Sequence, residues 1–315
     1  MGFNWNQTLG MLVGAGLTIA VFLTYASIKR RRKTARQERP PQSAKLLRPA
    51  GYWLSCQIEG LSEKFNLAVM ESVAAGMSLG LLLVGIYPLL AGLVLQRFTF
   101  AQIKAAPNSY YLYSFLFCAI ASMAWLTAAV AKTIKCLTEI RNYRFGLRGE
   151  QAVAEALANP GLISAGYVVF HDVPTDQTGN IDHVLVGPSG IYVLETKTRP
   201  KRKPTRDQRE QFVIFDGKTL QFPWCYDAKA VRQVERNAMW VRDFISGFGP
   251  KEITVQPVIV VPGWYVESKG NYPVKAMPQT YLVNDFLLPV KRQFSEDKLL
   301  PIIRRLDERC RTLEF

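Results

Sequence analysis

The chain has 315 residues, of which 49% are hydrophobic, so it has room for one large domain or for a smaller domain and a second part. The five cysteines are scattered without a C-x-x-C pair, and the chain has only two histidines, which argues against a zinc site. Free thiols fit a reducing compartment. The net charge of +14 is weak evidence for nucleic acid binding, because residues 1–131 carry +8 of it and residues 132–315 only +6.

Three stretches without Asp, Glu, Lys or Arg dominate the first part of the chain: residues 8–28, 72–96 and 105–131. A helix needs about 20 apolar residues to cross the hydrocarbon core of a bilayer. We therefore expect three transmembrane α-helices, at about 8–28, 69–96 and 110–131. The first stretch could instead be a cleaved signal peptide. Its basic cluster follows the apolar run, however, as in a retained anchor.

The charge of the loops predicts how these helices are oriented. Residues 29–65 hold ten Lys and Arg residues, whereas residues 97–104 hold two, and basic loops stay on the cytoplasmic side. We expect a multi-pass protein of the cytoplasmic (inner) membrane, with the N-terminus outside and a cytosolic basic loop at 29–65. The membrane region would cover residues 1–131, and the chain from Lys132 onward would be cytosolic.

Two glycine spacings in the apolar stretches bear on oligomerisation. Gly10-x-x-x-Gly14 and Gly76-x-x-x-Gly80 would let transmembrane helices approach closely in a homo-oligomer. Small residues are common in membrane helices, so these spacings are equally compatible with no such contact. The uncharged stretches 8–28, 72–96 and 105–131 offer no charged residue for a transport path.

From Lys132 onward the pattern is that of a folded domain. Residues 132–158 are expected to be helical, with a break near Gly146 and Gly149 that leaves 132–145 as a helical linker. Further elements are expected in this order: a strand at 167–170, a loop from His171, a hairpin at 181–197, a hairpin around Asp216-Gly217, a helix at 228–246, strands at 254–261 and 280–283, and a helix at 294–312. The order predicts an α/β domain over residues 146–315, with a mixed β-sheet flanked by helices.

The hairpin at 181–197 places two carboxylates opposite each other. The turn-forming sequence GPSG closes it with 186 opposite 191, 184 opposite 193, and Asp182 opposite Glu195. Side chains alternate along a strand, so Lys197 lies on the same face. Two facing carboxylates repel, and Lys197 or a divalent cation would relieve the repulsion. Mg²⁺ prefers oxygen ligands and commonly binds one or two carboxylates plus a substrate phosphate, which suits metal-assisted phosphodiester hydrolysis.

A third carboxylate lies on the helix that precedes the hairpin. Glu150 shares one helical stripe with Val153, Ala154 and Leu157, which places it at the end of the apolar face. A carboxylate in that position needs a metal ion or another cation as its partner. An ordinary first-turn acid that favours the helix dipole is the alternative.

These residues resemble the nuclease-related domain, NERD, a family of the PD-(D/E)-x-K nuclease superfamily. The resemblance rests on G-E-x-x-V at 149–153, on IDHVLVGPSGIYVLETK at 181–197 and on Gln233-x-x-x-Asn237, and it covers about residues 146–262. It implies a restriction-endonuclease-like fold, metal ligation by Asp182 and Glu195, a catalytic Lys197, and Glu150 as a further acidic member. Gln233 matches the polar residue that the family places on the later helix. The structural alternatives are a half-exposed charge triad at a sheet edge and a routine surface glutamine.

The basic insertion 198–210 follows the site directly. Six basic residues could hold phosphates beside the cleavage site: Arg199, Lys201, Arg202, Lys203, Arg206 and Arg209. Charge runs are often only solvated, and this one contains no aromatic residue for base stacking. The leading hypothesis is a membrane-anchored DNA nuclease that depends on Mg²⁺ or Mn²⁺, with RNA not excluded as substrate. The alternative is a catalytically inactive module that binds nucleic acid or proteins at the lipid bilayer.

Overall fold

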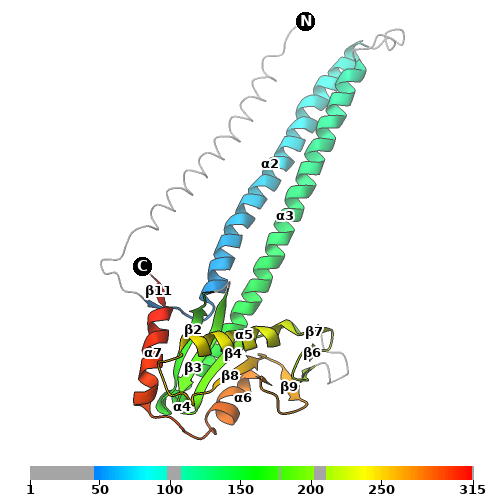
Figure 1. Cartoon of the computed structure of the whole chain (residues 1–315). Coiled ribbons are helices and arrows are strands. Elements are labelled where there is room, and N and C mark those ends of the chain that lie inside the picture. The colour runs from blue at the N-terminus through cyan, green and yellow to red at the C-terminus, as the bar shows by residue number, and fades with distance from the viewer. Residues whose placement is uncertain (1–45, 98–107, 177–178, 202–210, 314–315) are drawn as a thin grey trace. The chain divides into compact units, whose positions relative to one another are not determined.

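The computed structural model describes residues 46–97, 108–176, 179–201 and 211–313 (Figure 1). The described residues form two compact units. One unit contains residues 60–97 and 108–140, and the other contains residues 46–59 and 141–313. The short segment 46–59, which the sequence assigned to a cytosolic basic loop, is therefore part of the unit that also holds the β-sheet.

The first unit consists of parts of two long helices, α2 (Tyr52–Arg97) and α3 (Asn108–Leu157). They run antiparallel, with an ion pair between Lys132 Nζ and Glu71 Oε2 at 2.9 Å and a hydroxyl contact between Ser72 and Thr133 at 3.4 Å. Residues at seven-residue spacing are buried along each helix: Leu61, Ala68 and Ala75 on α2, and Ala129 and Cys136 on α3. This repeat is typical of a coiled-coil seam, and the small side chains let the two backbones approach closely.

The described residues do not support the prediction of three transmembrane helices. Among the described residues, one helical stretch, Ala119–Leu157, is long and apolar enough to cross a membrane by length and composition. Its charged residues begin at Lys132, so its apolar part lies before that residue. The first predicted span, 8–28, lies outside the described residues.

The predicted helix break at Gly146 and Gly149 is wrong, because α3 continues without interruption to Leu157. Gly149 instead provides room for a neighbouring strand end. A Cβ added to it would lie 1.8 Å from Thr198 Cγ2. Residues 132–145 are accordingly the middle of one helix, and α2 begins at Tyr52, inside the predicted loop 29–65.

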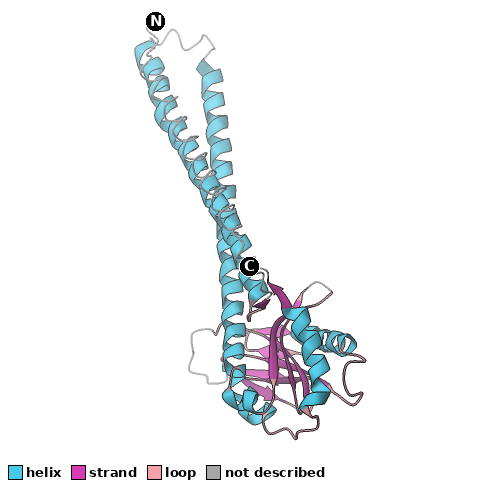
Figure 2. Cartoon of the chain, turned by 90° about the vertical axis from the view of Figure 1, so that its left-hand side faces the viewer, coloured by secondary structure: helices cyan, strands magenta, loops and turns pink. Residues whose placement is uncertain are grey.

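The expected mixed sheet is present, with helices on either side of its strands (Figure 2). It has five strands in the order β10-β8-β4-β3-β2. Strands β2 (Val168–Pro174), β3 (Asn180–Gly187) and β4 (Gly190–Thr196) form an antiparallel meander. Strands β8 (Val255–Val260) and β10 (Lys275–Met277) continue from β4 in parallel. The predicted loop from His171 is partly wrong, since β2 extends to Pro174.

Each face of this sheet is covered by helices. Val184, Val186, Ile191 and Val193 point to the face covered by α5 (Lys229–Phe244) and α7 (Glu296–Cys310). Their neighbours in sequence, among them Leu185 and Leu194, point to the other face, where the end of α3, α4 (Pro160–Ser164) and a π-helix (Leu282–Leu287) pack. Because both faces are buried, these strands consist of continuous apolar runs rather than alternating polar and apolar residues.

A second, smaller sheet has the order β7-β6-β5-β9. The Asp216-Gly217 hairpin is confirmed between β5 (Phe212–Phe215) and β6 (Leu220–Phe222). Strands β7 (Cys225–Asp227) and β9 (Tyr265–Ser268) complete this sheet, which the sequence did not predict as a separate layer.

Two further features of this unit differ from the prediction or add to it. The strand predicted at 280–283 is wrong. The segment is helical in α6 (Gln279–Tyr281) and in the π-helix, because β10 already occupies the edge beside β8. A short strand β1 (Leu46–Leu47) pairs with β11 (Arg311–Leu313), which joins the segment before α2 to the segment after α7.

Candidate active site

The β3–β4 hairpin has the register that the sequence predicts. Val186 lies opposite Ile191, and Val184 lies opposite Val193. Gly187 pairs with Gly190, so the loop contains only Pro188 and Ser189. The Ser189 hydroxyl fixes this end, since it contacts Tyr167 OH at 2.5 Å and Tyr192 OH at 2.8 Å.

Asp182 takes part in the backbone pairing at the open end of the hairpin. The last ladder pair is His183 opposite Leu194, so Asp182 and Glu195 stand at the next position of the same register. Asp182 Oδ2 accepts a hydrogen bond from the Thr196 backbone N–H at 2.6 Å. On the other side of β4, Lys197 N donates to Val260 O at 2.9 Å. The end of β4 that carries Glu195 and Lys197 is thus held from both sides.

The buried Glu195 and the half-buried Lys197 form an ion pair that also contacts α5. Lys197 Nζ lies 2.6 Å from Glu195 Oε1 and 3.1 Å from Gln233 Oε1. Asn237 Nδ2 donates to the second Glu195 oxygen at 3.4 Å. Glu195 is 2% exposed. The helix residues Gln233 and Asn237 are one turn apart, so a single stripe of α5 supports both members of the pair.

Burial and mutual repulsion shift the ionisation of these groups. The pKa of Asp182 is raised well above its ordinary value by burial, and then by the charges of Glu195 and Glu150. Burial also raises the pKa of Glu195, against the opposing effect of Lys197. Burial tends to lower the pKa of Lys197, but Glu195 outweighs this effect and the pKa is raised, so the lysine is held as a cation.

Glu150 is the third carboxylate, and it is 9% exposed. No described residue forms a hydrogen bond or an ion pair with its carboxylate. Its pKa is raised to about 8 by burial first, and then by the charges of Asp172 and Glu195. A buried carboxylate without a donor is destabilising unless it is protonated or a cation binds it. The Glu150 carboxylate is therefore influenced by the charge of Glu195, and its role as a metal ligand stays a prediction.

The chemistry of these oxygen atoms suits a hard divalent cation. Asp182 uses one oxygen for Thr196, and Glu150 uses neither of its oxygens within the described part of the chain. Among the described residues, no three His, Cys, Asp or Glu side chains converge into a complete ligand set. Mg²⁺ keeps several waters and needs only one or two carboxylates from a protein. The donor set fits such an ion, with substrate and water as its remaining ligands.

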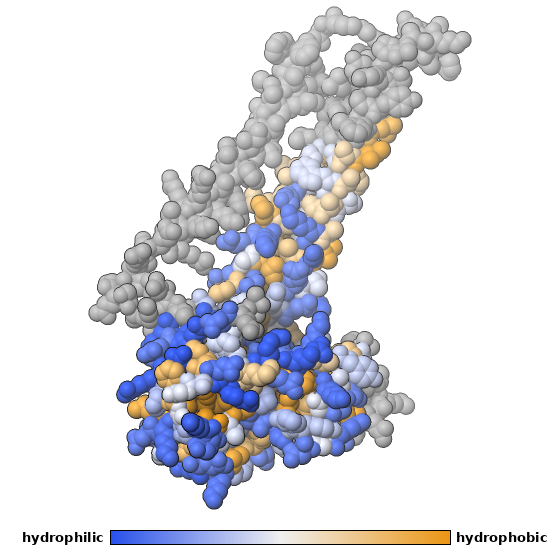
Figure 3. Space-filling model, in the orientation of Figure 1, coloured by the Kyte–Doolittle hydropathy of each residue, from blue (hydrophilic) through white to orange (hydrophobic). Residues whose placement is uncertain are grey.

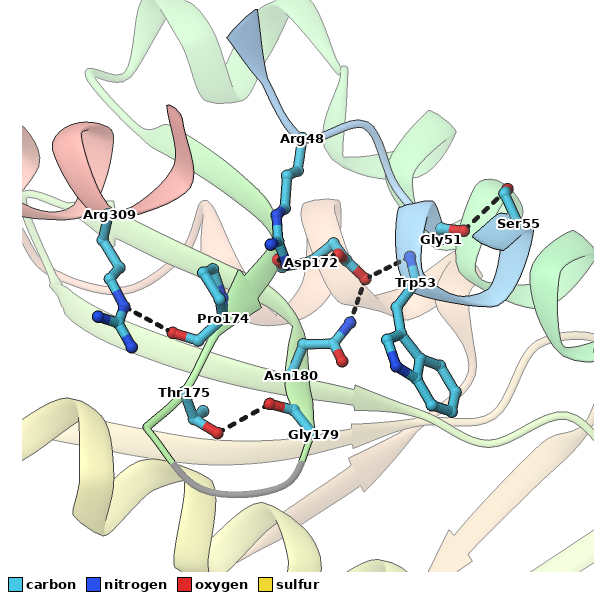
Figure 4. A network of polar contacts seen from close by, with 10 residues as sticks. All are labelled: Arg48, Gly51, Trp53, Ser55, Asp172, Pro174, Thr175, Gly179, Asn180 and Arg309. Atoms are coloured by element: carbon cyan, nitrogen blue, oxygen red, sulfur yellow. Dashed lines mark hydrogen bonds and ion pairs between the residues drawn. The ribbon is translucent and has the colours of Figure 1, made fainter. Parts of the chain in front are cut away.

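Asp172 is a fourth carboxylate that the sequence analysis missed. It is 1% exposed and has a left-handed backbone with φ 50°. Figure 4 shows its side chain between Arg48, Trp53 and Asn180. The Arg48 guanidinium lies 3.3 Å from Oδ2. The backbone N–H of Trp53 donates to Oδ1 at 3.2 Å, and the side-chain amide of Asn180 also donates to Oδ1.

The Asp172 carboxylate thereby holds the first turn of α2 beside the site. Gly51, which precedes this helix, is close to the third carboxylate, since a Cβ added to Gly51 would lie 3.4 Å from Glu150 Oε2. The sequence pattern around Asp172 could not indicate this role. The partners Arg48 and Trp53 lie more than 100 residues away from Asp172 in the chain.

The remaining predicted residues have different positions. Arg199 forms an ion pair with Asp227 at 2.7 Å, and Lys201 lies over the Trp264 ring at 5.4 Å. The other four basic residues of the insertion, Arg202, Lys203, Arg206 and Arg209, lie outside the described residues. His183 is fully buried, as a packing residue should be, and its Nδ1 lies 2.8 Å from His171 Nδ1.

Comparison with known proteins gives one match, which covers the segment that carries the candidate site. No curated protein and no solved structure matches the chain significantly. A family model described as "NERD: Nuclease-related domain" matches residues 145–262. This range runs from the last turns of α3 through the β3–β4 hairpin and α5 to the residues just after β8. Residues 145–262 therefore form a nuclease-related domain.

Proposed function

We propose that this protein is a membrane-anchored nuclease that hydrolyses phosphodiester bonds in DNA with the help of a divalent metal ion, Mg²⁺ or Mn²⁺. One observation carries the proposal. Within a nuclease-related domain, the ammonium group of Lys197 lies 2.6 Å from Glu195 at the end of β4, and Asp182 of the neighbouring strand β3 accepts a hydrogen bond from Thr196 between them. A buried cluster of carboxylates with one lysine is the residue set that metal-assisted hydrolysis requires.

Each side chain has a distinct role in this proposal. One or two of the three carboxylates Asp182, Glu195 and Glu150 would hold the metal ion, which, when bound, would polarise the phosphate and lower the pKa of a coordinated water. Lys197 stays protonated beside Glu195 and stabilises negative charge that develops on the phosphate oxygens. Gln233 accepts a hydrogen bond from Lys197 and so orients its ammonium group.

Membrane anchoring is part of the same proposal and is supported by the surface of the first unit. In Figure 3 apolar side chains are visible on the described part of the helical pair. Large hydrophobic residues are exposed there, among them Val73, Met77, Ile120, Met123, Trp125 and Ile134. Exposed large apolar side chains are unfavourable in water and favourable in lipid. The proposal includes three membrane spans and a cytosolic nuclease-related domain. It also includes an oligomer that forms through the spans.

The test uses the full chain in detergent or nanodiscs. A truncation that begins at Lys132 would remove Arg48 and Trp53, both of which contact Asp172. Supercoiled plasmid, linear duplex DNA and RNA are incubated with Mg²⁺, Mn²⁺ or EDTA. We expect metal-dependent cleavage of DNA that falls at least about 100-fold in Glu195→Gln and Lys197→Ala. Glu155→Gln, an exposed position on α3, is the matched control and should keep full activity.

Undiminished cleavage in both site variants would exclude the proposed site. Cleavage of RNA alone would retain the reaction but change the substrate. The alternative is a catalytically inactive binding module. It would be favoured if the protein binds DNA without metal and in a salt-sensitive way, if Asp182→Ala leaves this binding unchanged, and if no cleavage occurs.

A further inference from the structure

A pocket opens directly beside the candidate active site. One wall comes from the β2–β3 turn, with Thr175, Gly179 and Asn180, and the other wall comes from α5. The α5 wall is formed by Gln233, Arg236, Asn237 and Trp240, which share one stripe of the helix. Gln233 and Asn237 are also the residues that contact Lys197 and Glu195. The pocket and the site therefore share a wall.

Among the described residues that line the pocket, Arg236 is the one that carries a charge, and none is a carboxylate. Arg236 is exposed and forms no hydrogen bond or ion pair through its guanidinium group with any described residue. Other arginines on this side are engaged, since Arg309 pairs with Asp176 at 2.5 Å and Arg305 donates to Phe244 O at 2.8 Å.

Trp240 lines the end of the pocket that lies farthest along α5 from Gln233. The Trp240 ring stacks on Phe244 with centroids 4.8 Å apart, and its Nε1 donates to Asp176 Oδ2 at 3.3 Å. Trp240 thus offers a preformed apolar wall. The pocket thus presents a cationic group, Arg236, next to an apolar one, Trp240. A nucleic acid strand matches this arrangement, because its anionic phosphates are separated by less polar sugars.

We propose that this pocket binds the phosphate next to the scissile one, with Arg236 as the ligand of that phosphate and Trp240 as the wall against its sugar. The inference rests on the proposed nuclease function and adds a substrate subsite to it. Arg236 lies three residues, or about 4.5 Å along the helix axis, from Gln233. Guanidinium groups bind phosphate oxygens through two parallel hydrogen bonds, which gives orientation as well as affinity.

The competing role for Arg236 is to screen Glu195, whose pKa its charge lowers. The two roles differ in their effect on DNA binding without metal. A screening residue alters catalysis and leaves binding in EDTA unchanged. A phosphate ligand contributes to binding whether or not hydrolysis proceeds.

The experiment measures binding of fluorescein-labelled single-stranded and duplex DNA to the full chain in EDTA, over a series of salt concentrations. We expect Arg236→Gln to weaken binding about 10-fold and to reduce the slope of log K against log salt by about 0.7 for single strands or about 0.9 for duplex. Arg242→Gln, an exposed arginine on the same helix outside the pocket, removes the same charge and should retain the slope. Equal slopes for both variants and the parent protein would overturn the inference.

Cleavage in Mg²⁺ is scored separately, so that the two proposals can fail independently. If Arg236→Gln raises KM more than it lowers kcat, the subsite is supported. Cleavage that needs Glu195 and Lys197 but shows no change of KM in Arg236→Gln removes the subsite and leaves the nuclease standing. A slope change specific to Arg236 in a protein that cuts nothing removes the nuclease and leaves an anion-binding pocket.

Discussion

Replacing Glu150 with glutamine should make the folded protein less sensitive to rising pH in the absence of metal. Folding raises the pKa of Glu150 from 4.5 to about 8, so the folded state binds its proton more tightly than the unfolded state does. The stability from this group is fully present below pH 4.5 and is lost as the pH rises through about 8. Glutamine resembles the protonated form and cannot ionise.

The magnitude follows from the same shift. Each pH unit inside the window changes the free energy of unfolding by about 1.4 kcal/mol. When the pH rises from about 5 to about 7.5, the free energy of unfolding of the wild type should therefore fall by at most about 3 kcal/mol more than that of Glu150→Gln. Its carboxylate is 9% exposed, so solvent screens the effect little. Mg²⁺ should restore stability to the wild type near neutral pH, and less so to the variant, because an ion that binds only the folded state stabilises it.

The assay is urea-induced unfolding of the full chain in detergent, followed by tryptophan fluorescence at several pH values with EDTA or Mg²⁺. Glu155→Gln is the control for the loss of a carboxylate on the exposed side of α3. Parallel pH curves for the wild type and Glu150→Gln would refute the reasoning, because they would show that Glu150 is ionised without penalty in the folded state.

Two further predictions concern the packing around the site. Asp172→Ala should lower the free energy of unfolding by about 3 kcal/mol, since it removes the buried partner of Arg48, whereas Asp172→Asn should cost less because asparagine tolerates the left-handed backbone and keeps an acceptor. Urea unfolding measures both. Gly149→Ala should reduce cleavage about 10-fold, because the new methyl group would displace Thr198 next to Lys197, the lysine of the proposed site. Gly60→Ala is its control, since no atom lies within 4 Å there, and an unchanged cleavage rate in Gly149→Ala would contradict the packing argument.

Local pattern was enough to predict the centre of the fold. The turn residues Gly187 to Gly190 and the apolar runs on either side fixed the register that pairs Val184 with Val193 and leaves Asp182 and Glu195 just beyond the last ladder pair. A shift by one residue would have moved every one of these side chains to the other face, so the register and the site were one prediction. The stripe of α5 that carries Gln233 and Asn237 followed in the same way from helical spacing.

The pattern failed where a distant segment decided the outcome. Gly149 was read as a break because glycine weakens an isolated helix, yet α3 passes through it, since the close approach of Thr198 requires the missing side chain. The strand predicted at 280–283 failed because β10 had already taken the sheet edge. Propensity yields to packing when the competing contact lies elsewhere in the chain.

The sequence alone determined the hairpin, its facing carboxylates, the lysine beyond them and the nuclease-related character of residues 145–262. All of these depend on neighbours within a strand or a helix turn. Only the tertiary structure revealed Asp172 with its partners Arg48 and Trp53, and the pocket that Arg236 shares with Trp240. Those contacts join segments far apart in the chain, and the periodicity of one segment carries no information about which other segment will fold against it.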